Sequence, residues 1–242
     1  MLVLAIDTTS EHGGVALFRD RERVASVPNT GSSGYSVTLF QAVDRALAEA
    51  GAQLSKPALS LSDAEFFAAA NGPGSFTGIR TGLAATQGWA TALNRPVIGI
   101  SILAAMADAA RLQAGWAVPI MDARRGEFYL GLYGGGAKED REAFVAEGEG
   151  RVVKPNALQD LLEQRLISKA AVTCIIREHD QAAQALRPQL PAALGWQTVS
   201  DHLLESIVRL AMEAYERGKV QTPAQLDACY IRRSDAELNW RA

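Results

Sequence analysis

The order of apolar and polar segments repeats within this chain of 242 residues, and the repeat limits the fold more than any single motif does. Three short apolar segments open the chain and are joined by tight polar turns, which predicts an antiparallel β meander. Segments with helical and strand-like patterns then alternate. The expected elements are strands at 2–6, 15–18, 24–27, 66–70 and 97–100, and helices at 35–50, 77–93 and 101–113.

The second half of the chain partly repeats this order. Its first strand ends at Asp122 before a hairpin, as the first strand of the chain ends at Asp7. Two halves with one element order indicate duplication of an α/β module. The expected elements are strands at 117–121, 127–133, 144–153 and 171–176, and a helix at 155–166.

The domain boundaries follow from this repeat. We expect a first subdomain at 1–113 and a second, reduced subdomain at 114–200. The amphipathic helix at 201–218 is expected to pack back on the first subdomain, and 219–242 to form a C-terminal tail. The stretch at 181–199 matches no pattern.

Composition excludes several classes of protein. The chain has 24 Lys and Arg against 27 Asp and Glu, so any RNA contact must use a local patch or a partner's surface. Only Cys174 and Cys229 are present, too few for a disulfide framework, which favours a reducing cytoplasm. No apolar run approaches the roughly 20 residues that span a membrane, so we expect a cytoplasmic protein without a membrane partner.

Two loops have the chemistry of a phosphate site. Asp7 ends a strand and is followed by three hydroxyl residues, which suits either a metal-bound phosphate or a self-satisfied turn. The glycine-rich run at 71–80 leads from a strand into a helix, where free amides attract anions, but its spacing is not that of a Walker A loop. The alternative is a tight turn capped by Ser75 or Thr77. The candidate phosphate-proximal residues are Asp7, Thr8, Thr9, Gly72, Gly74, Ser75, Arg80 and Asp122.

The second hairpin, at 122–127, concentrates charge in the segment DARRGE. It suits contact with a phosphate or an acidic partner, and equally a solvated turn with internal ion pairs. The three histidines lack the spacing of a metal-binding pair, and no nucleophile with a base and an orienting group is recognisable. We therefore predict no catalytic residue and no metal ligand in this chain.

The helix at 77–93 carries small residues along one side, which permits a close approach of another helix. Internal packing on the sheet and an interface with a second subunit both remain open. On the interface interpretation, a bulky charged residue at Gly82 blocks pairing and leaves the fold intact. The candidate interface residues are Leu39, Val43, Gly78, Gly82, Leu83, Ala85 and Trp89.

Five segments resemble one family in the same order along the chain. They are LAIDTTS, NGPGSFTGIRTGLAATQGWA, PVIGISIL, MDARRGEFYLGLY and YIRR. They are similar to the TsaB (YeaZ) family of bacterial tRNA threonylcarbamoyladenosine biosynthesis proteins. The resemblance implies an α/β fold of the actin/Hsp70/sugar-kinase (ASKHA) type, with two RNase H-like subdomains of mixed sheet plus helices.

The resemblance also implies a role as a scaffold. Such proteins bind the catalytic paralogue TsaD, with the ATPase TsaE, and support transfer of threonylcarbamoyl from threonylcarbamoyl-AMP to the adenosine beside the tRNA anticodon. ATP and a metal then belong to the partner subunits, tRNA is met through the complex, and the chain alone needs no cofactor. The pairing surface lies on the helices at 35–50 and 77–93, and without TsaD it is expected to form a homodimer.

Two alternatives compete with the scaffold. One is a stand-alone ATP-dependent phosphotransferase of the sugar-kinase type that uses Asp7, Thr8, Gly74 and Asp122. The other is a metallopeptidase, which the histidine spacing already disfavours.

Overall fold

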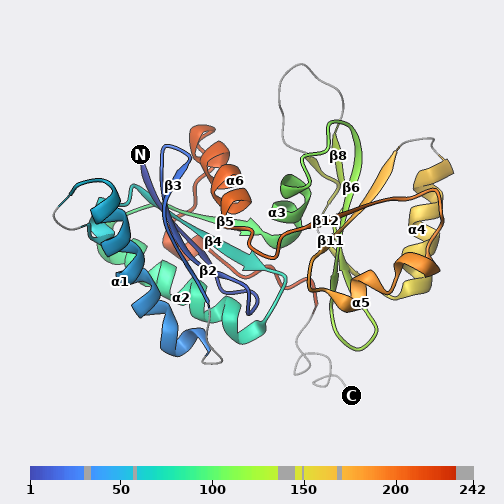
Figure 1. Ribbon diagram of the computed structural model, residues 1–242, viewed down its shortest axis with the longest axis horizontal. Coiled ribbons are helices and arrows are strands. Elements are labelled where there is room, and N and C mark those ends of the chain that lie inside the picture. The colour runs from blue at the N-terminus through green and yellow to red at the C-terminus, as the bar shows by residue number, and fades with distance from the viewer. Residues whose placement is uncertain (30–33, 57–58, 136–144, 149, 168–170, 233–242) are drawn as a thin grey trace. The chain divides into compact units, whose positions relative to one another are not determined.

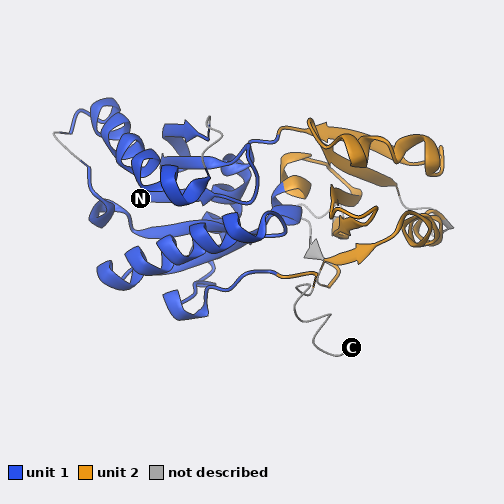
Figure 2. Cartoon of the chain, turned by 90° about the horizontal axis from the view of Figure 1, so that it is seen from below, with its two compact units in different colours: residues 1–105, 201–229 blue, residues 106–200, 230–242 orange. Residues whose placement is uncertain are grey.

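The computed structural model describes residues 1–29, 34–56, 59–135, 145–148, 150–167 and 171–232. The chain divides into two compact units, and Figure 2 colours them separately. Unit 1 contains residues 1–105 and 201–229, and unit 2 contains 106–200 and 230–242. Both units are built from sequence segments that are not contiguous.

Unit 1 is built on a five-stranded mixed sheet in the order β3-β2-β1-β4-β5. The first three strands form the predicted antiparallel meander, and β4 and β5 extend the sheet parallel to β1. β1 is buried on both faces because helices cover both sides of the sheet. The strands are β1 (Leu2–Asp7), β2 (Gly14–Arg19), β3 (Glu22–Pro28), β4 (Phe66–Gly72) and β5 (Val97–Ser101).

Helices α1 (Tyr35–Gln53) and α2 (Phe76–Leu93) cover one face of this sheet, and α6 (Leu204–Glu216) covers the other (Figure 1). The apolar stripe of α1 packs on Leu4, Ile6 and Leu17. On the other face, Phe66 stacks on Tyr215 of α6 with ring centroids 4.7 Å apart. The helix expected at 101–113 is shorter, α3 (Ile102–Ala109), and Arg111 after it adopts a left-handed conformation with φ 49°. A short 3-10 helix, η1 (Leu61–Asp63), precedes β4.

The segment after α6 packs on unit 1. Gln221 exchanges two backbone hydrogen bonds with Val97, so it covers the outer edge of β5. Gln87 of α2 donates from Nε2 to the carbonyl of Pro223, the first residue of the 3-10 turn η3 (Pro223–Gln225), and to that of Leu226, which follows the turn. Leu226 is buried in the core. The part of the expected tail at 219–229 therefore contributes to the core of unit 1.

Unit 2 repeats the central arrangement of unit 1. Its strand β6 forms a hairpin with β7 and pairs in parallel with β11, as β1 pairs with β2 and β4. The predicted fold class, α/β with two units of mixed sheet plus helices, is confirmed. The strands are β6 (Gly115–Asp122), β7 (Phe128–Leu130), β8 (Tyr133–Gly135), β9 (Val145–Ala146), β10 (Arg151–Val153), β11 (Val172–Arg177) and β12 (Gly195–Val199). The helices are α4 (Pro155–Ile167), α5 (Gln181–Gln184) and the 3-10 turn η2 (Arg187–Gln189).

The core of unit 2 is a separate apolar cluster. Leu158 and Leu162 of α4 pack on the sheet around Cys174 of β11. Burial raises the pKa of the Cys174 thiol to about 12, so this cysteine is a core residue and no nucleophile.

Within the described parts of the chain, no helix is both long and apolar enough to span a bilayer.

Candidate functional site

The polar side chains at the start of the hairpin after β1 are buried and are hydrogen-bonded within unit 1. Asp7, Thr8 and Thr9 are 0%, 1% and 2% exposed. Thr9 donates to Asp7 Oδ1 from its backbone nitrogen at 2.9 Å and from Oγ1 at 2.7 Å, and Thr8 Oγ1 donates to the carbonyl of Gly78 at 2.7 Å. These hydroxyls are therefore used inside unit 1.

The glycine-rich loop and the start of α2 form the cover of this hairpin. Ser75 donates its backbone N–H to the carbonyl of Thr9 at 2.7 Å. A Cβ atom at Gly78 would overlap the carbonyl oxygen of Thr8, and one at Gly82 would overlap its Oγ1. Glycine is needed at both positions because the helix lies directly against Thr8, against its backbone at Gly78 and against its side chain at Gly82.

This packing corrects the predicted phosphate site in unit 1. The residues Asp7, Thr8, Thr9 and Gly72 are buried, and Gly74 lies against the backbone of Thr9. Ser75 caps α2 by accepting from Gly78 N at 3.3 Å, as the turn interpretation expects. Arg80 is exposed and its guanidinium lies 4.0 Å from the centroid of the Phe76 ring. The side chains of Asp7, Thr8 and Thr9 therefore have no exposed surface to which a ligand could bind.

Tyr35 belongs to the same packed region. Its hydroxyl donates to the carbonyl of Ser10 at 2.8 Å. Burial, and then the charge of Asp7, raise the pKa of Tyr35 well above its usual value. The side chain at the start of α1 thus fixes the first hairpin from a second side.

A pH-dependent stability follows from Tyr35. A raised folded pKa gives a contribution that is complete below the unfolded pKa of about 10 and is lost as pH rises above it. The difference in unfolding free energy between the native protein and Tyr35→Phe is expected to shrink between about pH 9 and pH 11. Urea unfolding at these two pH values measures it. A constant difference would mean that Tyr35 ionises equally in both states.

The predicted interface on α1 and α2 also needs correction. Leu39, Val43 and Leu83 are at most 5% exposed and pack in the core of unit 1, and Gly78 and Gly82 are buried against Thr8. Ala85 and Trp89 are half-buried. A buried side chain offers no surface to another subunit, so five of the seven residues are core residues.

A different part of α1 presents apolar surface. Val37 is 64% exposed and Phe40 is 56% exposed. They are spaced i, i+3 and therefore lie on one side of the helix. The ring of Phe40 meets Trp89 of α2 edge-on, with centroids 5.6 Å apart. We call Val37, Phe40 and Trp89 the α1 apolar face. In the sequence, Val37 and Phe40 are apolar but lie outside the apolar stripe of the helix that begins at Leu39. These two residues are the signal from which the face could have been predicted.

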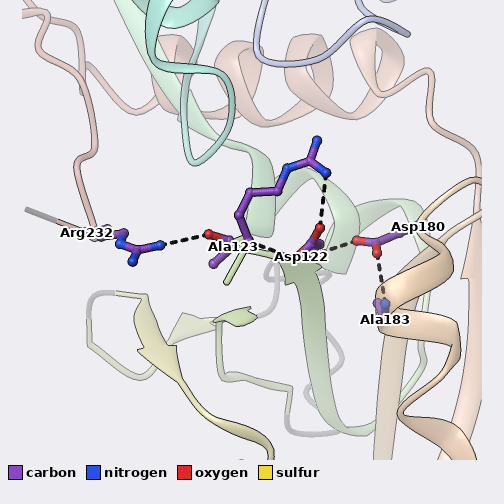
Figure 3. Close-up of polar contacts among 6 residues, drawn as sticks. Asp122, Ala123, Asp180, Ala183 and Arg232 are labelled. Atoms are coloured by element: carbon purple, nitrogen blue, oxygen red, sulfur yellow. Dashed lines mark hydrogen bonds and ion pairs between the residues drawn. The ribbon is translucent and has the colours of Figure 1, made fainter. Parts of the chain in front are cut away.

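The hairpin between β6 and β7 is open, unlike the first. Asp122 Oδ1 accepts from Arg124 N at 2.7 Å, and Asp122 Oδ2 lies 3.4 Å from Arg124 Nη1. Asp180 links the base of the hairpin to α5, because its two oxygens accept from Asp122 N and Ala183 N, each at 2.9 Å (Figure 3). The side chain of Arg124 is 88% exposed.

Arg232 completes this cluster from the C-terminal segment of unit 2. Its Nη1 donates to the carbonyl of Ala123 at 3.0 Å (Figure 3), and its Nη2 lies 3.2 Å from Glu127 Oε2. The sequence reasoning missed Asp180 and Arg232, because neither lies near the hairpin in sequence. One ion pair within the charged hairpin is present, between Arg124 and Asp122, whereas Glu127 pairs with Arg232 from outside the hairpin. The arginine tip lies at the surface.

The tip of this second hairpin has an unusual backbone. Arg124, Arg125 and Gly126 have φ angles of 65°, 58° and 72°. The left-handed conformation costs a residue other than glycine about 1–2 kcal/mol, so the two arginines destabilise the turn. The bonds made by Asp122, Asp180 and Arg232 offset this cost.

The fold defines an α/β protein of the actin/Hsp70/sugar-kinase type, with two related units of mixed sheet. Residues 23–175, more than half of the chain, match the sequence model of the family described as TsaD, tRNA N6-adenosine threonylcarbamoyltransferase. The chain belongs to this family.

The chain is similar over its whole length to the TsaB (YeaZ) proteins. It is 28% identical to the tRNA threonylcarbamoyladenosine biosynthesis protein TsaB of Escherichia coli K12, over 98% of this chain and 96% of that protein. It is 34% identical to TsaB of Bacillus subtilis 168 over 55% of each chain. The solved structure of YeaZ from Pseudomonas aeruginosa superposes with a TM-score of 0.70, at 26% identity, over 95% of this chain and 99% of that one. The predicted family resemblance is confirmed.

Proposed function

We propose that this chain is the non-catalytic partner of a TsaD-type catalytic subunit in tRNA threonylcarbamoyladenosine modification. It binds and supports the subunit that transfers threonylcarbamoyl from threonylcarbamoyl-AMP to the adenosine beside the anticodon. Family membership and the full-length similarity to TsaB support a role in this pathway. A TsaE-type ATPase is the third component, and tRNA is met through the complex.

One observation carries the partner role. The α1 apolar face leaves a large aromatic ring, Phe40, more than half exposed beside Val37. Aromatic residues at the centre of an interface contribute most to protein association. A TsaD-type subunit covers this face in the complex, and a second copy of the chain covers it when the partner is absent.

The closed first hairpin supports the absence of a nucleotide site of the sugar-kinase type in unit 1. A phosphate-binding hairpin needs accessible hydroxyls and amides, whereas Thr8 and Thr9 are at most 2% exposed. On this proposal, ATP and the metal belong to the partner subunits. Calorimetry of the chain alone with Mg-ATP distinguishes the alternatives, since tight binding would favour a stand-alone phosphotransferase.

Reconstitution tests the proposal directly. The chain is expected to show no transfer activity alone and to raise the activity of TsaD and TsaE, supplied with unmodified tRNA and threonylcarbamoyl-AMP, at least about tenfold. Incorporation of labelled threonine into tRNA measures the reaction. An equal rate with and without the chain contradicts the proposal. Metal analysis of the purified chain is the control for the peptidase alternative.

A further inference from the structure

The tip of the hairpin between β6 and β7 combines an unfavourable backbone conformation with two exposed arginines. Arg124 and Arg125 are exposed, and both have φ angles in the left-handed region. Asparagine and glycine adopt this conformation at lower cost and are the usual residues of such turns. Strained residues other than glycine persist where the surrounding structure imposes them, and they concentrate at binding sites.

The cluster that imposes this shape is polar and specific. Asp122 accepts a hydrogen bond from the backbone nitrogen of Arg124, and Asp180 accepts one from the backbone nitrogen of Asp122 (Figure 3). Arg232 donates to the carbonyl of Ala123. Glu127 pairs with Arg232 at the base of the hairpin. Asp180 is thus bonded to backbone nitrogens, and Glu127 to Arg232 at the base of the hairpin. Asp122 also lies 3.4 Å from Arg124 Nη1, but the side chain of Arg124 stays 88% exposed, so the tip still presents guanidinium groups to the surface.

From this arrangement we infer that Arg124 and Arg125 form a contact site for the phosphate backbone of an RNA. The inference rests on the proposed function, which makes tRNA the nucleic acid concerned. A guanidinium is planar, stays charged and binds phosphate oxygens through two donors. Two of them on an exposed turn therefore suit a phosphate backbone. The overall charge of −3 leaves such a local patch as the route to RNA.

The turn permits a test that separates charge from strain. Arg124→Asn with Arg125→Gly removes both guanidiniums and supplies the residues that this backbone prefers. Arg124→Gln with Arg125→Gln removes the charges and keeps the strain. Both variants are expected to bind tRNA about tenfold more weakly in the assembled complex, and the slope of log affinity against log salt is expected to fall by about two. The Asn-Gly variant is expected to unfold at a higher urea concentration than the native chain.

The measurement is fluorescence anisotropy of labelled unmodified tRNA with the full chain and its TsaD- and TsaE-type partners, over a series of KCl concentrations. Arg187→Gln with Arg217→Gln is the matched control, since both residues are exposed and the change in net charge is the same. This control is expected to keep the native affinity and slope. Size exclusion establishes for every variant whether the complex assembles.

Each outcome decides the inference. Unchanged affinity and slope in both hairpin variants overturn it, and so does loss of complex assembly, which assigns the arginines to a protein contact. An equal loss of affinity in the control reduces the effect to overall charge and also overturns it. If the native chain fails to assemble, the proposed function fails, and the chain alone is then tested with the same tRNA. Absence of binding, or equal binding by the variants, rejects the inference there as well.

Discussion

Phe40→Asp is expected to prevent association with the TsaD-type partner while unit 1 stays folded. Phe40 is 56% exposed and its ring meets Trp89 edge-on, so we expect its loss to cost the fold little. In the proposed complex the partner covers this ring, so a charged group there would be desolvated without a counter-charge. Loss of an aromatic residue at an interface centre costs about 2–4 kcal/mol, which is roughly 30- to 1,000-fold in affinity.

Val220→Asp is the matched control for this experiment. Val220 is 42% exposed in the same unit but lies after α6, outside the α1 apolar face. Titration calorimetry with purified TsaD-type subunit compares the two variants, and circular dichroism confirms that both are folded. A folded Phe40→Asp protein with native affinity would place the interface elsewhere and remove the observation on which the partner role rests.

Gly78→Ala is expected to destabilise unit 1 by about 3 kcal/mol, the upper part of the range for overpacking a rigid site. The added methyl group would overlap the carbonyl oxygen of Thr8. A backbone atom of a buried hairpin cannot move aside as a flexible side chain does. Urea unfolding monitored by circular dichroism measures the change.

Gly88→Ala in the same helix provides the control. Among the described residues, no atom outside the neighbouring turns of α2 lies within 4 Å of a Cβ built at Gly88, so only helix propensity changes. Alanine is favoured over glycine inside a helix by about 1 kcal/mol, and the variant is expected to be more stable by that amount. If both substitutions had the same effect, the close contact between α2 and the first hairpin would be refuted.

The same contact changes what is expected of a charged residue at Gly82. Such a residue would disturb the packing of α2 on the first hairpin, so a loss of pairing could not be assigned to an interface.

The architecture was largely predictable because it depends on local patterns. The meander and the helices on unit 1 follow from apolar spacing, and the aspartates that end β1 and β6 marked the repeat. The stretch at 181–199 gave no prediction, since α5 and η2 are each shorter than five residues. Such short elements carry too few residues to show a period.

The candidate sites were harder to predict because their meaning depends on what lies opposite each residue. A row of small residues on α2 was compatible with an interface and with close internal packing, and only the position of Thr8 decided between them. For the second hairpin, the sequence showed the charges but not the distant residues Asp180 and Arg232 that fix its shape. Contacts across such separations leave no local signal.

The discontinuous make-up of unit 1 bears on how the molecule is made. When a ribosome has produced residues 1–105, the sheet still lacks α6 and the segment at Gln221 that covers β5. Residues 106–200 must be synthesised before these pieces arrive. During that interval, one apolar face and one strand edge of the nascent domain stay bare, which makes this the period of greatest exposure to chaperones and to aggregation.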